Sequence, residues 1–106
     1  IPKRDWSSDV CSSDLASFTC KEDTVEDILK HLPKVVSAVQ KEPGCLKYDC
    51  YRDTKNPRAF TFIEHWASQQ DLDAHSTGDA IRLWQQLSGD LREPGTVVQV
   101  LADIDR

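Results

Sequence analysis

The sequence predicts an α+β domain with the element order β-α-β-β-α-β. Three features predict it: a long segment with helical apolar spacing, two strand-like segments joined by a polar turn, and an apolar segment that follows a second helical region. This order is the split arrangement of ferredoxin-like folds, in which the helices cover one face of an antiparallel sheet.

The first strand is expected from Ala16 to Lys21, and a long helix is expected from about Asp23 or Thr24 to Lys41. Acidic residues crowd the start of this helix, where negative charge suits the positive end of the helix dipole. Pro43-Gly44 follows its end. The apolar residues recur at the spacing of one buried helical face: Val25, Ile28, Leu29, Leu32, Val35, Val36 and Val39.

The second and third strands are expected at Cys45–Arg52 and Ala59–Trp66, with a turn over residues 53–57 between them. Side chains alternate between the two faces of a strand. The second strand therefore has Leu46, Tyr48 and Cys50 on one face and Cys45 on the other. The third strand has Phe60, Phe62, Glu64 and Trp66 on one face, and Thr61, Ile63 and His65 on the other.

A short helix is expected from Ser68, as its N-cap, to His75. A second helical piece follows, with a stripe of Ala80, Leu83, Trp84 and Leu87.

The last strand is expected from about Thr96 to Asp103. Val98, Val100 and Ile104 lie on one of its faces, and Val97 and Leu101 lie on the other. Apolar residues on both faces indicate that both are covered. A second copy, packed sheet against sheet, is the simplest cover for so small a domain, so we expect a homodimer.

The composition limits the classes of function. The chain has 106 residues and a formal net charge of −5, with no cluster of basic residues of the kind that binds nucleic acid. No apolar run approaches the 18 residues of a membrane span. The cysteines include no C-x-x-C pair and favour reduced thiols, so we expect a cytoplasmic protein without nucleic-acid or membrane partners.

The N-terminal segment is not expected to belong to the domain. Residues Arg4 to Leu15, RDWSSDVCSSDL, resemble the translation of a short-read sequencing adapter. Residues 1–15 are therefore expected to be a non-native or disordered leader, which replaces the start of the first strand. Trp6 and Cys11 carry no functional weight, and residues 16–106 are expected to form a single domain.

The stretch from Glu42 to His75 resembles the core of the antibiotic biosynthesis monooxygenase (ABM) domain family, which includes quinol-type monooxygenases. The resemblance extends over roughly Ser17 to Asp103. It rests on an ordered set of residues: Glu42-Pro43-Gly44-Cys45, Tyr48, Arg52-Asp53, Phe60, Glu64, Trp66, Ser68, Leu72, Ala74 and His75.

This resemblance implies a dimeric α+β barrel and a monooxygenase that works without a cofactor on a quinol or another electron-rich aromatic molecule. The anion of such a substrate can itself give an electron to dioxygen. The protein must then bind the substrate, help to deprotonate it and exclude water, which requires a mostly apolar cavity with a few polar groups.

The candidate catalytic residues are His75 and His65, because imidazole exchanges protons near neutral pH. The candidate substrate-binding residues are Tyr48, Phe62, Glu64, Trp66 and Trp84. Structural roles stay open for several of them: His75 could simply pair with Asp71, Trp66 could be a core aromatic, and Glu64 could bond Tyr48, Arg52 or Arg58. No metal site is expected, since the two histidines lack a convincing third ligand.

Two other functions stay open. The same scaffold could carry a non-oxidative enzyme, such as an isomerase or decarboxylase, which needs a base but no dioxygen. It could also be a small-molecule-binding dimer without turnover.

Overall fold

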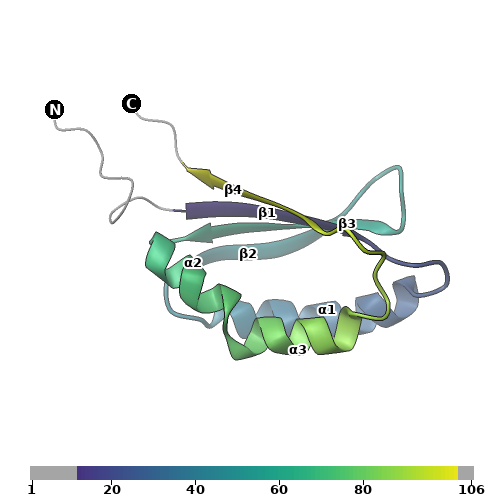
Figure 1. Ribbon diagram of the computed structural model, residues 1–106, viewed down its shortest axis with the longest axis horizontal. Helices are drawn as coiled ribbons and strands as arrows, with labels where there is room; N and C mark the ends of the chain where they lie inside the picture. Colours follow the sequence, from purple (N-terminus) through teal and green to yellow (C-terminus); the bar gives the residue numbers. More distant parts are fainter. Residues whose placement is uncertain (1–11, 103–106) are drawn as a thin grey trace, which may run out of the picture.

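The computed structural model describes residues 12–102, and the side chains of residues 13–101 (Figure 1). The chain forms a sheet that lies over a layer of helices. In chain order, the elements are β1 (Ser12–Thr19), α1 (Val25–Gln40), β2 (Cys45–Arg52), β3 (Ala59–Trp66), α2 (Gln69–Ser76), α3 (Asp79–Ser88) and β4 (Val97–Ala102).

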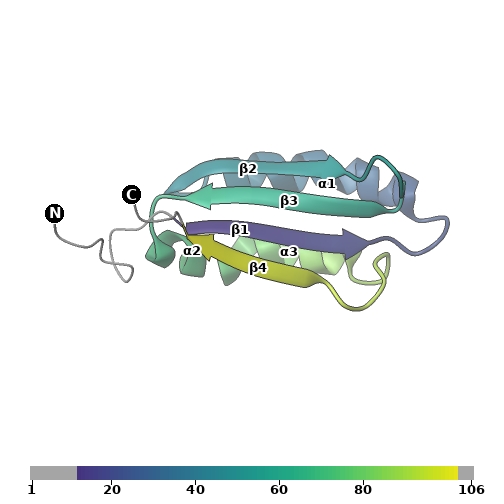
Figure 2. The ribbon, with the colours of Figure 1, turned by 90° about the horizontal axis from the view of Figure 1, so that it is seen from above.

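The four strands are antiparallel and lie in the order β2-β3-β1-β4 (Figure 2). β1 and β3 are therefore the central strands. Asp14 pairs with Glu64, and Ala16 pairs with both Phe62 and Val98, so these five side chains point to the same face. The topology confirms the predicted ferredoxin-like α+β fold.

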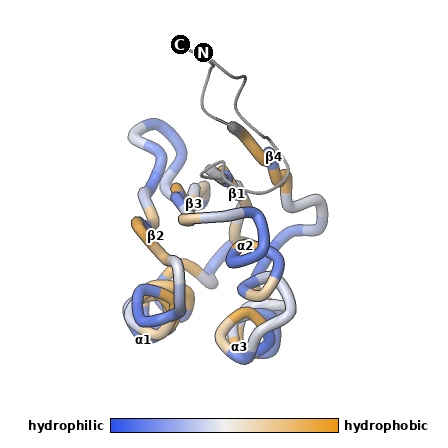
Figure 3. Tube along the Cα trace, turned by 90° about the vertical axis from the view of Figure 1, so that its left-hand side faces the viewer, coloured by the Kyte–Doolittle hydropathy of each residue, from blue (hydrophilic) through white to orange (hydrophobic). Residues whose placement is uncertain are grey.

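All three helices lie on one side of the sheet, with α1 beneath β2 and α3 toward the β4 side (Figure 3). The face of α1 that was predicted from its apolar spacing is buried at Ile28, Leu32, Val35 and Val39. An aromatic group packs between the sheet and α3: the ring centroid of Phe18 lies 5.4 Å from those of both Phe60 and Trp84. These contacts form the hydrophobic core.

β1 begins at Ser12, four residues before the predicted start, and it ends at Thr19 rather than Lys21. Residues 12–15, which belong to the predicted leader, pair with both β3 and β4. Residues 1–11 lie outside the described part of the chain, as do Asp103 and Ile104, which were assigned to the last strand. The non-native origin of the segment and the division at residue 15 stay predictions.

Several details of the predicted side-chain arrangement are wrong. A bulge in the pairing of β2 lies between Cys45 and Lys47, so Cys45 and Cys50 both pack against the core instead of pointing to opposite faces. Leu29 and Leu83, which were assigned to the apolar stripes of α1 and α3, are 39% and 41% exposed, and Leu46, which was assigned to the same face of β2 as Tyr48, is 61% exposed. Within residues 12–102, no helix has the length and apolar character needed to cross a bilayer.

Candidate functional site

A cavity of about 350 Å³ lies between the sheet and helices α2 and α3. All four strands contribute to its wall, and so does the loop that joins α3 to β4. The lining residues are Asp14, Ala16, Phe18, Tyr48, Phe62, Glu64, His75, Ser76, Ile81, Trp84, Gln85, Arg92, Thr96 and Val98. It is the place where buried ionisable groups meet buried aromatic rings.

His75 lies in the last turn of α2 and is buried. Its Nδ1 lies 2.7 Å from Oε1 of Glu42, and its ring stacks on Trp66 with the centroids 4.7 Å apart. A carboxylate oxygen can only accept, so this hydrogen bond places a proton on Nδ1 and directs Nε2 toward Glu64 Oε1, 3.7 Å away. The pairing with Asp71 considered above is not formed, because Asp71 instead accepts a hydrogen bond from Ser68.

The turn between α1 and β2 holds Glu42 in place. Gly44 has φ of +78°, and a Cβ atom there would overlap the carboxylate of Asp71 at the start of α2. The carbonyl of Gly44 accepts a hydrogen bond from the N–H of Ala67 at 2.8 Å. The Glu-Pro-Gly turn is thus seated against the β3–α2 junction, which brings Glu42 to His75.

Glu64 lies on β3 and is 3% exposed. Its Oε1 accepts a hydrogen bond of 2.9 Å from Nε1 of Trp66, and not from Tyr48, Arg52 or Arg58. Burial raises the pKa of Glu64 to about 7, although the Trp66 hydrogen bond opposes the shift. A carboxyl group with this pKa can take up and release a proton at neutral pH.

Asp14 lies directly opposite Glu64 on β1, and its side chain also faces the cavity. It is 8% exposed, and its Oδ1 has no hydrogen-bond partner. Burial raises the pKa of Asp14, while His75 partly opposes the rise. Because like charges disfavour each other, Asp14 also contributes to the raised pKa of Glu64.

Aromatic rings form the apolar wall of the cavity. Phe62 is central: its ring centroid lies 5.2 Å from that of Tyr48 and 5.6 Å from that of Trp84. Burial raises the pKa of Tyr48, so this side chain stays a neutral phenol at physiological pH. The wall suits a flat aromatic ligand.

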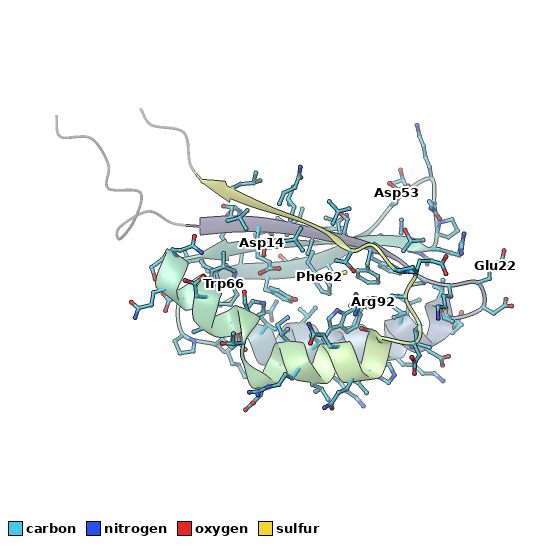
Figure 4. All side chains as sticks on the ribbon, viewed as in Figure 1. Asp14, Glu22, Asp53, Phe62, Trp66 and Arg92 are labelled. Carbon is cyan, nitrogen blue, oxygen red and sulfur yellow. The ribbon has the colours of Figure 1, made fainter. Side chains whose placement is uncertain are left out.

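Arg92, in the loop before β4, lines the cavity away from the carboxyl groups. In Figure 4, Phe62 lies between Asp14 and Arg92 along the length of the sheet. The cavity therefore has an acidic part, an aromatic middle and a basic part.

His65 lies on the other face of the sheet. Its side chain is exposed, and its Nδ1 lies 2.7 Å from Oγ of Ser13. The structure does not bring His65 to the cavity that holds His75, and the catalytic role of His65 stays a prediction.

Five of the seven residues predicted for the site line one cavity: Tyr48, Phe62, Glu64, His75 and Trp84. Trp66 does not line the cavity, but its ring stacks on His75 and its Nε1 donates a hydrogen bond to Glu64. Sequence reasoning missed Asp14, Arg92 and the role of Glu42. The signal for Glu42 was its place in the Glu-Pro-Gly motif, whereas Asp14 was set aside with the leader.

Within the described part of the chain, no group of three or more His, Cys, Asp or Glu side chains could hold a metal ion.

The chain was compared with known proteins. The family model described as antibiotic biosynthesis monooxygenase matches residues 14–87. No curated protein shows significant sequence similarity to the chain.

Solved structures share the fold over nearly the whole chain. One named as an antibiotic biosynthesis monooxygenase is 26% identical, with a TM-score of 0.80 over 88% of this chain and 98% of its own. A protein from Shewanella oneidensis is also 26% identical, with a TM-score of 0.81 over 93% of this chain and 97% of its own. A protein from Mycobacterium tuberculosis is 23% identical, with a TM-score of 0.81 over 91% and 97%.

Proposed function

Because this chain belongs to the antibiotic biosynthesis monooxygenase family, we propose that it is a cofactor-independent monooxygenase of a quinol or another electron-rich aromatic molecule. The observation that carries the proposal is a buried carboxyl group, Glu64, whose pKa is raised to about 7 and which lines an aromatic cavity. Such a group is suited to deprotonate a phenolic hydroxyl in a site with little water.

Glu64 is proposed as the general base, and His75 as the group that supports it. The 3.7 Å separation between His75 Nε2 and Glu64 Oε1 is too long for a good hydrogen bond but short enough for a small movement to close. Glu42 holds the imidazole through the 2.7 Å contact with its Nδ1, so that Nε2 faces Glu64. Glu42 is thus a positioning residue.

The electrons for the reaction come from the substrate. Deprotonation leaves an electron-rich quinol anion, which gives one electron to dioxygen. A C–O bond then forms between the two radicals, and loss of water yields a hydroxyquinone. One quinol and one dioxygen give one hydroxyquinone and one water, so atoms and electrons balance without another reductant. The aromatic wall around Phe62 positions the ring.

We further propose that the protein acts as a cytoplasmic homodimer, in which a second copy covers the open face of the sheet. Leu15, Ile63, Val97 and Leu101 lie on this face by register, and Val97 and Leu101 are 59% and 44% exposed. Exposed apolar residues on β4, next to half-buried ones on β1 and β3, favour a protein partner. Sedimentation at micromolar concentration is expected to give a dimer, and a 12 kDa species would contradict this proposal.

Oxygen uptake with a panel of hydroquinones and polyphenols tests the proposed reaction. Uptake is expected to exceed autoxidation and to be lost with heat-denatured protein, and labelled dioxygen is expected to place one labelled atom in the product. Metal and flavin content would be measured on the same sample. Product formation at the same rate without dioxygen would contradict the proposal and indicate a non-oxidative enzyme.

A further inference from the structure

We propose that Arg92 binds an anionic or carbonyl group on the substrate, at the end opposite the hydroxyl that Glu64 deprotonates. The inference rests on the proposed function, because it concerns the substrate class of the same cavity. It predicts an elongated hydroxyaromatic ligand with a hydrogen-bond acceptor at its far end.

The guanidinium of Arg92 is held in a defined position. Its Nε donates to Oγ of Ser88 at 2.9 Å, and its Nη1 donates to Oγ1 of Thr96 at 2.8 Å. Ser88 is fully buried, and its own hydroxyl donates to the carbonyl of Trp84. The guanidinium also lies 5.9 Å from the centroid of the Trp84 ring. A cation held in this way loses little side-chain entropy when it binds a ligand.

The charge of Arg92 is not neutralised within the described part of the chain, since no carboxylate there forms an ion pair with it. The two hydroxyl groups that hold it are neutral acceptors, so its positive charge remains available to a ligand. A half-buried arginine beside an aromatic wall is a good partner for a carboxylate, a carbonyl or an enolate oxygen.

The acidic and basic parts of the cavity are well separated. The backbone of Arg92 pairs with Cys20, which follows Asp14 by roughly 20 Å along the direction of β1. The Arg92 side chain reaches back from there to Trp84 and Thr96, so a ligand that contacts both ends must be longer than one benzene ring. Asp14 and Glu64 would repel an anionic group, which fixes the orientation of the ligand as well as its chemistry.

A pair of ligands that differ in one group tests the inference. 6-Hydroxy-2-naphthoate has a hydroxyl and a carboxylate at opposite ends, and 2-naphthol lacks only the carboxylate. Affinities for both would be measured by calorimetry with the full chain, at low and moderate salt. The wild type is expected to bind the naphthoate at least tenfold more tightly, as for one charge-assisted hydrogen-bonded pair.

Three variants locate the cause of this preference. Arg92→Gln is expected to bring the ratio of the two affinities close to one, with little change for 2-naphthol. Arg92→Lys keeps the charge but loses the planar fork, so it is expected to retain part of the preference. Arg82→Gln removes an exposed charge from α3, where Arg82 pairs with Asp79, and is the control for net charge. It is expected to retain the full preference.

Thermal unfolding would establish that each variant is folded, and Arg92→Lys provides a second test if Arg92→Gln is not. An equal affinity of the wild type for both ligands would overturn the inference, as would a preference that survives in Arg92→Gln or no binding of either ligand. These outcomes are separate from the proposed reaction, because the binding experiment involves no turnover. Oxygen uptake on unsubstituted hydroquinones without a carboxylate preference would leave the proposed function standing and reject the role of Arg92.

Discussion

His75 and His65 lie on opposite sides of one sheet and differ in burial and in the groups that they contact. His75 is buried, stacked on Trp66, and bonded to Glu42 beside a carboxyl group of raised pKa. His65 is exposed, and Ser13 is its hydrogen-bond partner. The helix-covered face thus places ionisable groups in an aromatic cavity, whereas the open face places His65 near the apolar residues Leu15, Ile63 and Leu101.

This difference indicates that the helix-covered face is suited to proton transfer and the open face to association. Burial and neighbouring carboxyl groups adjust the affinity of Glu64 for protons, which water would prevent on the open face. On the open face, Val97 and Leu101 are 59% and 44% exposed, and they are suited to association with another protein surface. Substitutions on each face test these two roles.

The largest effect is expected from Glu64→Gln. Gln keeps the size of the side chain and can still accept the hydrogen bond of Trp66, but it cannot take a proton. The kcat for quinol oxidation is expected to fall by about 100-fold to 10,000-fold, which is the range for loss of a general base. Glu26→Gln, on the exposed surface of α1, is the control. Turnover by Glu64→Gln within a few fold of wild type would remove this residue from the mechanism.

The same substitution is expected to change the dependence of stability on pH. Glu64 has a folded-state pKa of about 7 and an ordinary value of 4.5, so the folded state binds the proton more tightly. The wild type therefore loses stability as pH rises from about 4.5 through 7. Relative to wild type, Glu64→Gln is expected to gain on the order of 2–3 kcal/mol between pH 4 and pH 8.

Urea unfolding at several pH values measures this change. Asp14, whose pKa is also raised by burial, contributes in the same direction in both proteins. If the difference in stability between wild type and variant does not depend on pH, the pKa of Glu64 is not raised in the folded state.

The next effect concerns the open face. Leu101→Lys places a charge where a second copy is proposed to pack. The dissociation constant of the dimer is therefore expected to rise by about tenfold or more. Leu83→Lys is the matched control, because Leu83 is similarly exposed but lies on α3. Sedimentation over a concentration series measures both. Equal dissociation constants for the two variants would place the interface elsewhere.

The smallest effect is expected from His65→Ala. The side chain lies outside the cavity and makes one exposed hydrogen bond. The kcat is expected to change by less than about threefold, compared with the large loss for His75→Ala. Steady-state oxygen uptake by both variants makes the comparison. Equal losses for His65→Ala and His75→Ala would place chemistry on both faces of the sheet.

Much of the fold was predictable because local patterns determine it. The apolar face of α1 and the alternation along β3 were read correctly from residue spacing, and the cap of α2 was read correctly from Ser68. The bulge that turns Cys45 toward the core was not predicted, because the adjacent Gly44 was assigned to the turn after the helix.

The site was predictable where the spacing within one element or the resemblance to the family singled out a residue, as it did for Tyr48 and His75. Phe62, Glu64 and Trp66 follow from the period of one strand. The Glu42–His75 pair joins residues 33 positions apart in the chain, and Arg92 reaches the cavity from a loop. Contacts of this kind depend on how the helices, strands and loops pack together. The spacing of residues along the sequence does not predict that packing. Asp14 was missed for another reason: the resemblance of its segment to an adapter hid its place in β1.

The most direct test is the pH dependence of oxygen uptake with a hydroquinone, corrected for autoxidation, in wild type and Glu64→Gln. A base must be ionised to act, so the wild-type kcat/KM is expected to rise with pH around a midpoint near 7 and to be lost on acidification. The residual activity of Glu64→Gln is expected to lack this midpoint. A wild-type profile without a midpoint near 7, or the same midpoint in Glu64→Gln, would contradict the assignment of Glu64 as the base.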